Sequence, residues 1–244
     1  MCSDTVAALA VSGLGKIYKI YNRPMDRIKE LYSVRGRNYH HEFTALENIA
    51  FEVFRGETIG VIGPNGSGKS TLLHLIGGLD KPDSGTVELN GTNIADMSGN
   101  KLSDFRRDNI GFIFQAYNLI PVLSAAENIE YIMLLQGITA AKRRIRVKEM
   151  LDIVGLAGME NRRPAQLSGG QQQRVAVARA MASNPSIILA DEPTANLDSK
   201  TGISLLNVMK ELNQNRNMTF VFSTHDQKII ERARRLVYLR DGKI

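Results

Sequence analysis

The sequence of 244 residues predicts an α/β fold, with a mostly parallel sheet flanked by helices, an antiparallel β subdomain and a small helical subdomain. First, strand and helix patterns alternate over the last third of the chain, which is typical of a parallel sheet covered by helices. Second, a glycine-rich loop at residues 63–71 stands between a strand pattern and a helix pattern. Third, residues 6–20 and 44–62 are rich in strand-forming residues, which favours β structure near the N-terminus.

Composition excludes several classes of protein. Hydrophobic residues make up 43% of the chain and charged residues 23%, a balance typical of globular proteins rather than of disordered or collagen-like chains. Apolar runs such as Val6–Val11 and Tyr131–Leu135 are far shorter than the roughly 18 residues that a membrane-spanning helix needs. The lone Cys2 cannot form an internal disulfide. We therefore expect an intracellular protein. Its net charge of +6 suits an anionic partner, although charge alone favours a solvated basic surface.

Local patterns in the first half of the chain predict hairpins. Two alternating apolar runs, Ala45–Val53 and Glu57–Ile62, flank Arg55-Gly56 and indicate one hairpin. Asn90-Gly91 indicates a second, because this dipeptide favours the tight turn that joins paired strands.

Residues 22–43 form a polar insertion of mixed charge between the two β-rich segments. We expect at least one helical turn in it, around Met25–Leu31. His40 and His41, which fall in this polar stretch, are expected to be solvated.

The second half of the chain begins with a strand at Asn109–Phe114. Ser124 and Glu127 then form a capping box, which opens a helix that Gly137 closes. A basic helix follows from Lys142 to Val154, where Gly155 ends it. These helices predict a helical subdomain at residues 116–165. Beyond it we expect helices at Gln171–Ala182, Ser199–Leu212 and Gln227–Ala233, and strands at Ser186–Ala190 and Thr219–Ser223. Leu236–Leu239 with Asp241-Gly242 is expected to end in a turn.

The glycine-rich loop has the pattern of a phosphate-binding loop. It follows a strand at Thr58–Ile62 and precedes a helix at Thr71–Ile76, the context that this motif requires. Its glycines let backbone N–H groups surround an oxyanion, and the helix N-terminus adds about half a positive charge. Lys69 then reaches the β- and γ-phosphates, and the Ser70 hydroxyl is a ligand for Mg²⁺. The loop thus predicts a P-loop NTPase core. Its residues are Gly63, Pro64, Asn65, Gly66, Ser67, Gly68, Lys69, Ser70 and Thr71.

Two carboxylates end the predicted strand that follows the helical subdomain. Asp191 suits the coordination shell of Mg²⁺, and the adjacent Glu192 can polarise a water molecule towards the γ-phosphate. An Asp-Glu pair at a strand end is usually only a polar terminus, but a phosphate-binding loop in the same chain favours the catalytic interpretation.

A second anion site is predicted where Leu167-Ser168-Gly169-Gly170-Gln171 meets a helix start. Ser168 and the amides of Gly169 and Gly170 would form another oxyanion-binding helix N-terminus. One nucleotide is already held by the first loop, so this site needs an explanation. Two copies related by a two-fold axis, each completing the other's nucleotide site, would supply it.

These motifs together resemble those of ATP-binding-cassette (ABC) ATPases, and the resemblance covers nearly the whole chain as a single domain, 1–244. It rests on six motifs in the family's order: Gly63–Thr71, Gln115, Leu167–Gln171, Ile187–Glu192, Asn196–Asp198 and His225. The resemblance implies ATP and Mg²⁺ as cofactors.

The same resemblance implies individual roles for further residues. Tyr18 is similar to the aromatic residue that stacks on adenine, and Gln115 to the glutamine that touches Mg²⁺ and the attacking water. Asp198 resembles the residue that links two subunits near the water at Glu192, and Gln171 completes the second anion site. His225 resembles the histidine that holds the γ-phosphate. These roles agree with the chemistry of the side chains. An aromatic ring can stack on a base, hydrogen-bond donors can stabilise charge that develops on phosphate, and a carboxylate can activate water.

Two classes of function are compatible with this family. A soluble ABC ATPase that acts on nucleic acid is disfavoured. The repair type separates its motifs by a long coiled coil, but Ser168 follows Lys69 by only 99 positions. The translation type carries two cassettes, and this chain has one. The compact segment after Gln115 is typical of the motor subunit of a membrane transporter. We therefore expect a transmembrane permease and a second copy of the chain as partners, no nucleic acid, and a peripheral location at the cytoplasmic face of the membrane.

Within the transporters, two groups compete. Residues 111–121, 163–173 and 189–202 resemble the lipoprotein-release and macrolide-export group, which we favour because its matches cover more of the chain. Residues 18–31 resemble ATPases that export polysaccharide, O-antigen or teichoic acid, and this group is the alternative. The apolar segment Ala116–Leu123 is expected to line a groove for a cytoplasmic helix of the permease, with Leu119 and Leu123 as anchors.

Overall fold

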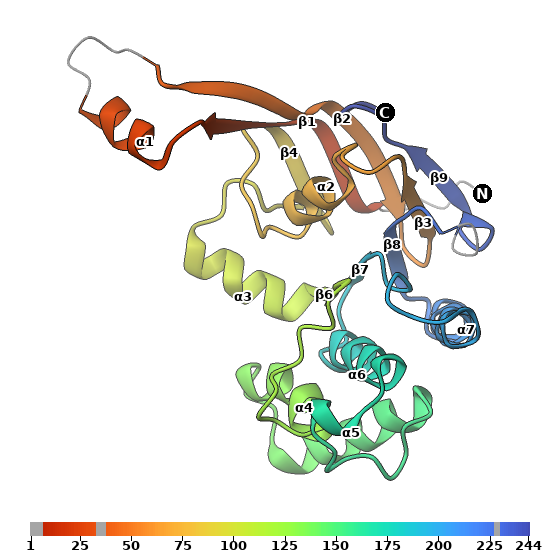
Figure 1. The fold of residues 1–244 in the computed structure, drawn as a ribbon. Coiled ribbons are helices and arrows are strands. Elements are labelled where there is room, and N and C mark those ends of the chain that lie inside the picture. The colour runs from red at the N-terminus through yellow and green to blue at the C-terminus, as the bar shows by residue number, and fades with distance from the viewer. Residues whose placement is uncertain (1–6, 33–37, 227–229) are drawn as a thin grey trace.

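The computed structural model describes residues 7–32, 38–226 and 230–244 (Figure 1). In this part of the chain two sheets form: an antiparallel sheet of order β2-β1-β4-β5 and a parallel sheet of order β6-β7-β8-β3-β9. A group of helices lies beyond the parallel sheet, at the end of the molecule opposite the antiparallel sheet (Figure 1). The predicted α/β class and its three parts are confirmed.

The antiparallel sheet is built on one long pair of strands. β1 (Ala7–Tyr21) pairs with β2 (His40–Phe54) along its whole length, and β4 (Ser84–Leu89) pairs with the other edge of β1. β5 (Thr92–Asn93) completes the sheet through the predicted Asn90-Gly91 hairpin. Asn90 and Gly91 have φ angles of 49° and 75°, as this kind of turn requires, so the prediction is confirmed.

The parallel sheet contains β3 (Thr58–Ile62), β6 (Ile110–Ile113), β7 (Ile187–Asp191), β8 (Thr219–Thr224) and β9 (Arg235–Tyr238). β8 is buried over its entire length and lies between β7 and β3. Strands of parallel sheets are covered on both faces, so they are apolar at consecutive rather than alternating positions. The run Ile59–Ile62 in β3 has this pattern.

The predicted hairpin around Arg55-Gly56 is wrong. β2 belongs to the antiparallel sheet, whereas β3 pairs in parallel with β8 and β9. Two hydrogen bonds fix the turn between them: Gly56 N donates to Thr219 Oγ1 of β8 at 3.0 Å, and Asn213 Nδ2, from the helix that precedes β8, donates to Gly56 O at 2.8 Å. A tight turn with φ of 72° at Gly56 therefore redirects the chain from one sheet to the other, which local sequence cannot distinguish from a hairpin.

Each face of the parallel sheet has its own apolar core. Ile59, Leu189 and Val221 pack against α2 (Lys69–Ile76), which lies between this sheet and the antiparallel one. Ile188 and Phe222, which point to the other face, pack against α6 (Gly169–Ala182) and α7 (Ser199–Arg216). Because side chains alternate between the two faces along each strand, the parallel sheet packs against α2 on one face and against α6 and α7 on the other.

The helical subdomain contains α4 (Ala125–Leu135), α5 (Ala140–Ile153) and the 3-10 helix η1 (Pro164–Gln166). The predicted capping box is confirmed: Glu127 N donates to Ser124 Oγ, and Ser124 N donates to the Glu127 carboxylate at 2.7 Å. Gly137 and Gly155 have φ angles of 73° and 68°, as expected of residues that end helices.

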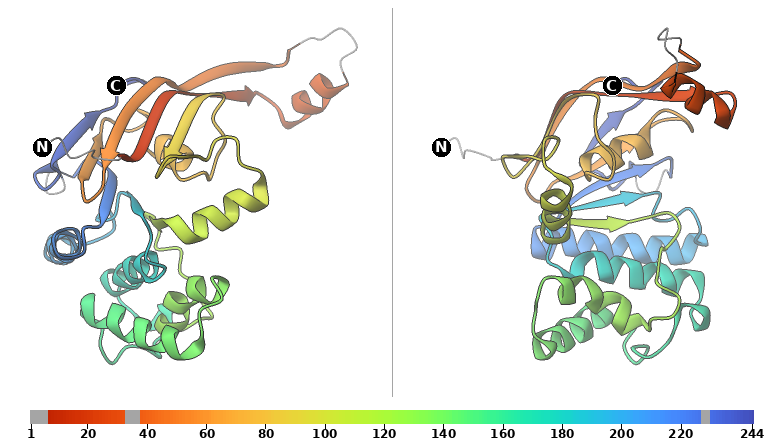
Figure 2. Two further views of the ribbon diagram at one scale, coloured as in Figure 1. Left: turned by 180° about the vertical axis from the view of Figure 1, so that it is seen from behind. Right: turned by 90° about the vertical axis from the view of Figure 1, so that its left-hand side faces the viewer.

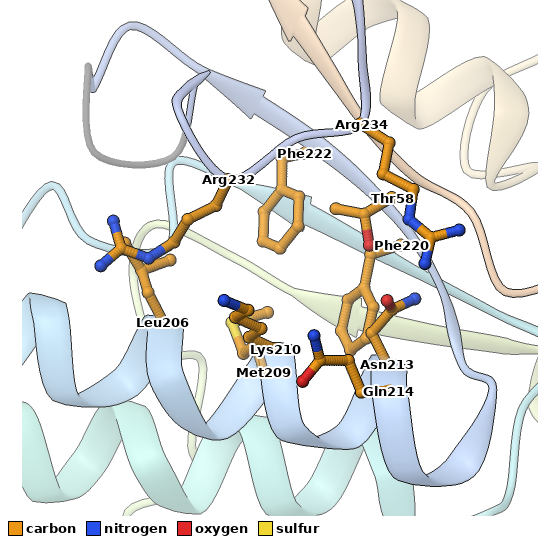
Figure 3. A pocket seen from close by; sticks show the side chains of 10 residues that line it. All are labelled: Thr58, Leu206, Met209, Lys210, Asn213, Gln214, Phe220, Phe222, Arg232 and Arg234. Carbon is orange, nitrogen blue, oxygen red and sulfur yellow. The ribbon is translucent and has the colours of Figure 1, made fainter.

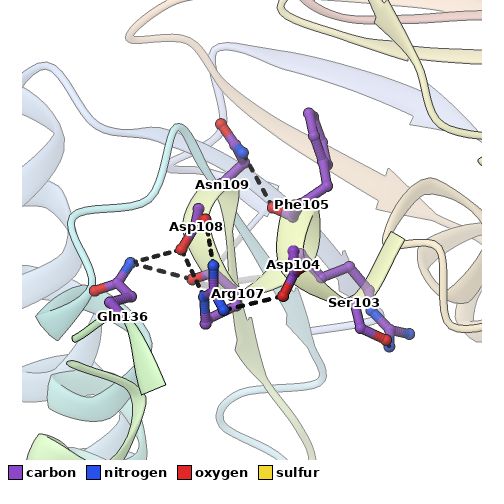
Figure 4. Close-up of polar contacts among 8 residues, drawn as sticks. Ser103, Asp104, Phe105, Arg107, Asp108, Asn109 and Gln136 are labelled. Atoms are coloured by element: carbon purple, nitrogen blue, oxygen red, sulfur yellow. Dashed lines mark hydrogen bonds and ion pairs between the residues drawn. The ribbon is translucent and has the colours of Figure 1, made fainter. Parts of the chain in front are cut away.

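The helix α3 (Gly99–Asn109) was not predicted, because its polar sequence lacks a buried stripe. Side-chain contacts at its C-terminal end attach it to the helical subdomain (Figure 4). Arg107 forms ion pairs with Asp104 and Asp108, and Gln136 Nε2 at the end of α4 donates to Arg107 O and Asp108 Oδ1. These tertiary contacts hold α3 in place, and the local sequence pattern gives no indication of them.

The insertion differs in part from its prediction. The expected helix is present as α1 (Pro24–Leu31), but the strands extend until Tyr21 pairs with His40, so the segment between them is shorter than 22–43. His40 is not solvated: its side chain is only 4% exposed and its Nδ1 lies 2.7 Å from a Glu30 carboxylate oxygen. The polar sequence misled the prediction because Glu30 and Tyr21 supply a polar environment for this ring.

Two further observations concern the helices. The predicted helix at Gln227–Ala233 falls partly on residues 227–229, which lie outside the described residues; Ile230 is helical and a turn follows at 231–232. Over the described ranges, none of the helices has the length and apolar character that crossing a membrane would require.

We predict that Asn128 fixes the segment that precedes α4. Its side chain is nearly inaccessible, donates to the carbonyls of Ile120, Leu123 and Ser124, and accepts a hydrogen bond from Ile120 N at 2.8 Å. Asn128→Ala should lower the free energy of unfolding in urea by about 1–3 kcal/mol, because it strands buried polar groups. The exposed Asn215→Ala on α7 is the control and should stay within about 0.5 kcal/mol of the wild type. Equal stability of the two variants would contradict this role.

Candidate active site

The predicted site residues come largely together in one cavity of about 570 Å³. It opens where β3, β6, β7 and β8 end, the edge of a parallel sheet at which ligands usually bind. The antiparallel sheet closes one side of it. The lining residues are Tyr18, Phe43, Ala45, Asn65, Gly66, Gly68, Lys69, Ser70, Thr71, Gln115, Glu192 and His225.

The phosphate-binding loop depends on its glycines. Gly68, with a φ of 101°, ends the loop in a conformation that a side chain would strain, and it directly precedes α2. A Cβ at Gly63 would collide with the carbonyl oxygen of Leu239. The buried Lys69 bends back so that its Nζ donates to the carbonyls of Gly63 and Pro64 at 2.9 and 3.0 Å. This ammonium group is thus held over the loop, where phosphate oxygens would meet it.

Glu192 lies beside His225 at the mouth of the cavity. One Glu192 carboxylate oxygen is 2.8 Å from His225 Nδ1, and the other accepts a hydrogen bond from Thr224 Oγ1 at 3.3 Å. The side chain of Glu192 is only 12% exposed, whereas that of His225 is 65% exposed. The backbone of Glu192 has an unusual φ of 46° and is fixed by a hydrogen bond from its N–H to Ser223 O. A carboxylate held in a strained conformation at a cavity mouth is typical of a catalytic group.

The residues present fit a magnesium ion bound together with phosphate. Within the described part of the chain, Oδ1 of Asp191 is buried and accepts no hydrogen bond, although an unsatisfied carboxylate oxygen is costly. Among the same residues, no group of three or more His, Cys, Asp or Glu side chains could hold a metal ion by itself. Carboxylate, hydroxyl and phosphate oxygens are the ligands that Mg²⁺ prefers. Asp191 and the exposed Ser70 would therefore share the ion with a nucleotide.

An aromatic wall closes the cavity on the side of the antiparallel sheet. Tyr18 donates from its hydroxyl to Asp80 Oδ2 at 2.9 Å, and burial and the Asp80 carboxylate raise the pKa of Tyr18. The Lys16 ammonium lies 5.2 Å from the centroid of the Tyr18 ring. Phe43 is the direct cross-strand partner of Tyr18 and is 50% exposed. Sequence analysis missed Phe43, although pairing β1 with β2 in register would have placed it beside Tyr18.

The second predicted anion site lies elsewhere. Ser168 is the N-cap of α6: its Oγ accepts a hydrogen bond from Gln171 N, and its N–H donates to Gln171 Oε1 at 2.9 Å. Of the described residues that line the cavity, none comes from 168–171. Gly169 and Gly170 begin the same helix, and a Cβ at Gly170 would collide with Thr201 at the start of α7.

Asp198 also lies outside the cavity lining. It caps α7 by accepting hydrogen bonds from Thr201 N and Lys200 N, both at 3.0 Å, and the bonds from Thr201 lower the pKa of its carboxyl group. The nearby Asn196 Nδ2 donates to Gln115 O at 2.9 Å, so this loop does contact the segment that carries Gln115. The structure thus brings one group of predicted residues to the cavity and leaves the other group on adjacent surface.

An apolar groove of about 250 Å³ lies between β6, α4 and α6. Phe112, Phe114, Ile120 and Tyr131 are among its lining residues. Leu119, expected as a docking anchor, packs against the core of the helical subdomain instead. Ile120 and Val122 are the exposed large hydrophobic residues of the segment Ala116–Leu123, with 37% and 69% of their surface accessible.

A smaller cavity of about 220 Å³ lies between α7, β8 and the segment that leads to β9 (Figure 3). Phe220 and Phe222 lie beneath it, and Lys210, Arg232 and Arg234 extend around it (Figure 3). The predicted catalytic and binding residues do not occur among its described lining residues, so it is separate from the candidate active site.

Comparison with known proteins identifies the family of these motifs. The sequence model of the ABC transporter family matches residues 46–195. The macrolide export ATP-binding/permease protein MacB of Hyphomonas neptunium is 43% identical over 91% of this chain, which spans 34% of that protein. The lipoprotein-releasing system ATP-binding protein LolD of Pseudoalteromonas translucida is 39% identical over 84% of this chain and 88% of its own.

A solved structure agrees with the sequence relatives. It is the dimeric, post-hydrolysis state of an ATP-binding cassette of Methanocaldococcus jannaschii, bound to ADP and Pi. That cassette superimposes with a TM-score of 0.84 at 40% identity and covers 97% of this chain and 96% of its own.

We predict that Asp191 is required for Mg²⁺ to strengthen nucleotide binding. Asp191→Asn keeps the size of the side chain but removes the charge of its unsatisfied oxygen. The gain in ATP affinity on adding Mg²⁺, measured by calorimetry against EDTA, should fall by about ten- to hundredfold, as when a metal site loses a supporting partner. Asp152→Asn, on an exposed position of α5, should leave this gain unchanged. An undiminished gain in Asp191→Asn would place the ion elsewhere.

Proposed function

This chain belongs to the ABC transporter family of ATPases, and we propose that it is the motor subunit of a membrane exporter of the lipoprotein-release or macrolide-export type. The observation that carries the catalytic part is the position of Glu192, paired with His225 at 2.8 Å and facing the cavity of the phosphate-binding loop. The named relatives support export, since one is a macrolide export protein and the other belongs to a lipoprotein-releasing system. They give no support to the polysaccharide alternative.

ATP hydrolysis follows from the arrangement of these groups. The loop amides and Lys69 bind the phosphates, and the ring of Tyr18 receives the adenine. Glu192 takes a proton from a water molecule, whose oxygen bonds to the γ-phosphorus while the bond to ADP breaks. His225 donates a hydrogen bond to the γ-phosphate, and Gln115 orients the water. Ser70, Asp191 and Gln115 would hold a magnesium ion, which would supply positive charge beside the phosphates.

We propose that two copies complete each other's sites. The N-terminus of α6, with Ser168, Gly169, Gly170 and Gln171, lies outside the cavity of its own chain. A two-fold axis would place it over the γ-phosphate in the partner subunit, with Asp198 near the attacking water. The dimeric state of the cassette from M. jannaschii supports this arrangement.

A permease is the proposed membrane partner. The apolar groove between β6 and α4 has a lining suited to apolar side chains of a short cytoplasmic helix, and Gln115 follows soon after β6. Binding there would connect the permease to the nucleotide site and hold the chain at the cytoplasmic face of the membrane. Within the single domain 1–244 we assign this contact to the helical subdomain, residues 116–165.

We predict that Glu192→Gln binds ATP as the wild type does but hydrolyses it about 10²–10⁴ times more slowly, because the amide cannot accept the proton. Phosphate release and equilibrium binding of ATP measure the two effects separately. Lys69→Ala should instead weaken binding itself, and Glu211→Gln, an exposed position on α7, should alter neither. Full hydrolysis by Glu192→Gln would refute the assignment of the base.

The same variant tests the shared site. With saturating ATP and Mg²⁺, Glu192→Gln should accumulate as a dimer in size-exclusion chromatography with light scattering, because it cannot hydrolyse the nucleotide that joins the subunits. Adding Ser168→Arg to this variant should return it to a monomer, since a bulky side chain would block the N-terminus of α6. A monomer in both cases would contradict the two-fold arrangement.

We predict that the groove, rather than Leu119, anchors the permease. Ile120→Asp with Tyr131→Asp should abolish co-purification with the membrane subunit while ATP hydrolysis by the isolated chain persists, because neither residue lines the nucleotide cavity. Val122→Asp is the matched control, since Val122 is more exposed but does not appear among the described groove residues. Assembly of the double variant with the permease would place the contact elsewhere.

A further inference from the structure

The helix α1 stands at the end of a long arm. β1 and β2 continue as a pair beyond the rest of the antiparallel sheet and carry α1 away from the body of the molecule (Figures 1 and 2). All residues of α1 are partly or fully exposed, among them Met25, Ile28 and Leu31, which are 58%, 50% and 80% exposed. Tyr32, which follows the helix, is 77% exposed. Neither ATP hydrolysis nor the proposed groove explains why this apolar surface is exposed.

The helix sorts its side chains into three sectors. At about 100° per residue, Met25, Ile28, Leu31 and the following Tyr32 fall within an arc of about 120°. The two acidic residues, Asp26 and Glu30, fall on the opposite side. The two cationic residues within the helix, Arg27 and Lys29, fall at the two borders between these sectors. Apolar residues flanked by cations are typical of a helix that lies in the interface of a membrane.

The acidic sector anchors α1 to the arm. Glu30 accepts hydrogen bonds from Tyr39 N at 2.8 Å and from the Tyr21 hydroxyl at 3.1 Å, and one of its oxygens lies 2.7 Å from His40 Nδ1. The backbone N–H of Tyr39 and then His40 lower the pKa of Glu30 to about 2, so the anchor stays ionised at physiological pH. Because Glu30 faces the strands, the apolar sector on the opposite side of α1 faces outward.

We propose that α1 is a membrane-surface anchor that places its apolar sector among the lipids and its cations against anionic phospholipid headgroups. This inference rests on the proposed function, in which the chain is located at the membrane. The helix α1 would then contact the membrane in addition to the contact with the permease. Charge complementarity favours lipid, because Glu30 is turned towards the strands and Asp26 pairs with Lys29 at 3.4 Å, while the side chains of Arg27 and Lys29 stay exposed beside the apolar sector.

The size of the surface also favours lipid over a protein partner. A stable protein interface uses about 20–30 residues on each side, whereas α1 has eight residues on a narrow arm. A bilayer requires no matching shape, and a few apolar side chains together with nearby cations suffice for reversible binding that adds to the contact with a permease.

The chain contains no tryptophan, so a single introduced tryptophan reports on one position. Leu31→Trp places the reporter in the apolar sector, and Ile145→Trp places it on α5, at a residue that is 71% exposed. Both full-length variants are titrated with vesicles of phosphatidylcholine and phosphatidylglycerol (7:3) and with vesicles of phosphatidylcholine alone. We expect the emission of Leu31→Trp to shift to shorter wavelength with the anionic vesicles, less so with the neutral ones, and that of Ile145→Trp to remain unchanged.

Reversing the charges of Arg27 and Lys29 distinguishes their attraction to anionic headgroups from insertion of the apolar side chains. In the Leu31→Trp background, Arg27→Glu with Lys29→Glu should weaken binding to the anionic vesicles by about thirtyfold or more, whereas Arg144→Glu on α5 should not. Loss of ATP hydrolysis in these variants is not expected, because α1 lies outside the nucleotide cavity. Loss of lipid binding with ATP hydrolysis intact would therefore test the role of α1 alone, whereas loss of ATP hydrolysis would concern the proposed function.

Three results would overturn the proposal. The first is an unchanged Leu31→Trp emission with both kinds of vesicle, or an equal shift in both tryptophan variants. The second is a shift that appears only when vesicles also contain the permease, which would make the occupant a protein. The third is a shift that rises with protein concentration in the absence of lipid, which would indicate contact between two copies.

Discussion

The parallel pairing of β3 beside β8 is the constraint on which the rest of the structure depends. Thr58–Ile62 align in register with Phe220–Thr224, and β7 aligns with the other edge of β8. All these strands therefore end at one edge of the sheet, and the residues that follow them meet there although they are far apart in sequence. The phosphate-binding loop follows β3, Glu192 follows β7 and His225 follows β8. An antiparallel β3 would have sent its loop to the opposite edge.

The antiparallel sheet contributes what the parallel sheet lacks. Phosphate recognition needs amides and charges, which strand ends and the N-terminus of α2 supply, but a nucleotide base needs an apolar surface. The extended ladder between β1 and β2 places Tyr18 and Phe43 side by side, where they would provide such a surface. α2 joins the two systems, because its apolar side chains belong to the core that both sheets share while its N-terminus carries Lys69.

The distribution of the site over two surfaces has consequences for regulation. A nucleotide bound to one chain would meet the N-terminus of α6 only when a second chain arrives, so hydrolysis would depend on assembly. Gln115 lines the nucleotide cavity and follows β6, whose residues line the apolar groove. Asn196, in the segment that leads to Asp198, donates a hydrogen bond to the carbonyl of Gln115. Contacts at the groove, at the nucleotide and at a second chain would thus converge on one short segment.

The sequence by itself determined the features that depend on neighbouring residues. The phosphate-binding loop, the capping box at Ser124 and the turn at Asn90-Gly91 need only local chemistry, so their patterns were sufficient. The order of motifs added the family, and with it residues such as Gln115 and His225 that the fold then brought to the cavity.

Only the tertiary structure decided the features that depend on distant partners. The turn at Gly56 is a change of sheet because Thr219 and Asn213 hold it, and His40 is buried because Glu30 and Tyr21 surround it. Phe43 joins the cavity through its register with Tyr18, and α3 is attached by contacts with Gln136. In each case the stabilising group lies many residues away or across a strand pair, and local propensity carries no information about which partner the folded chain supplies.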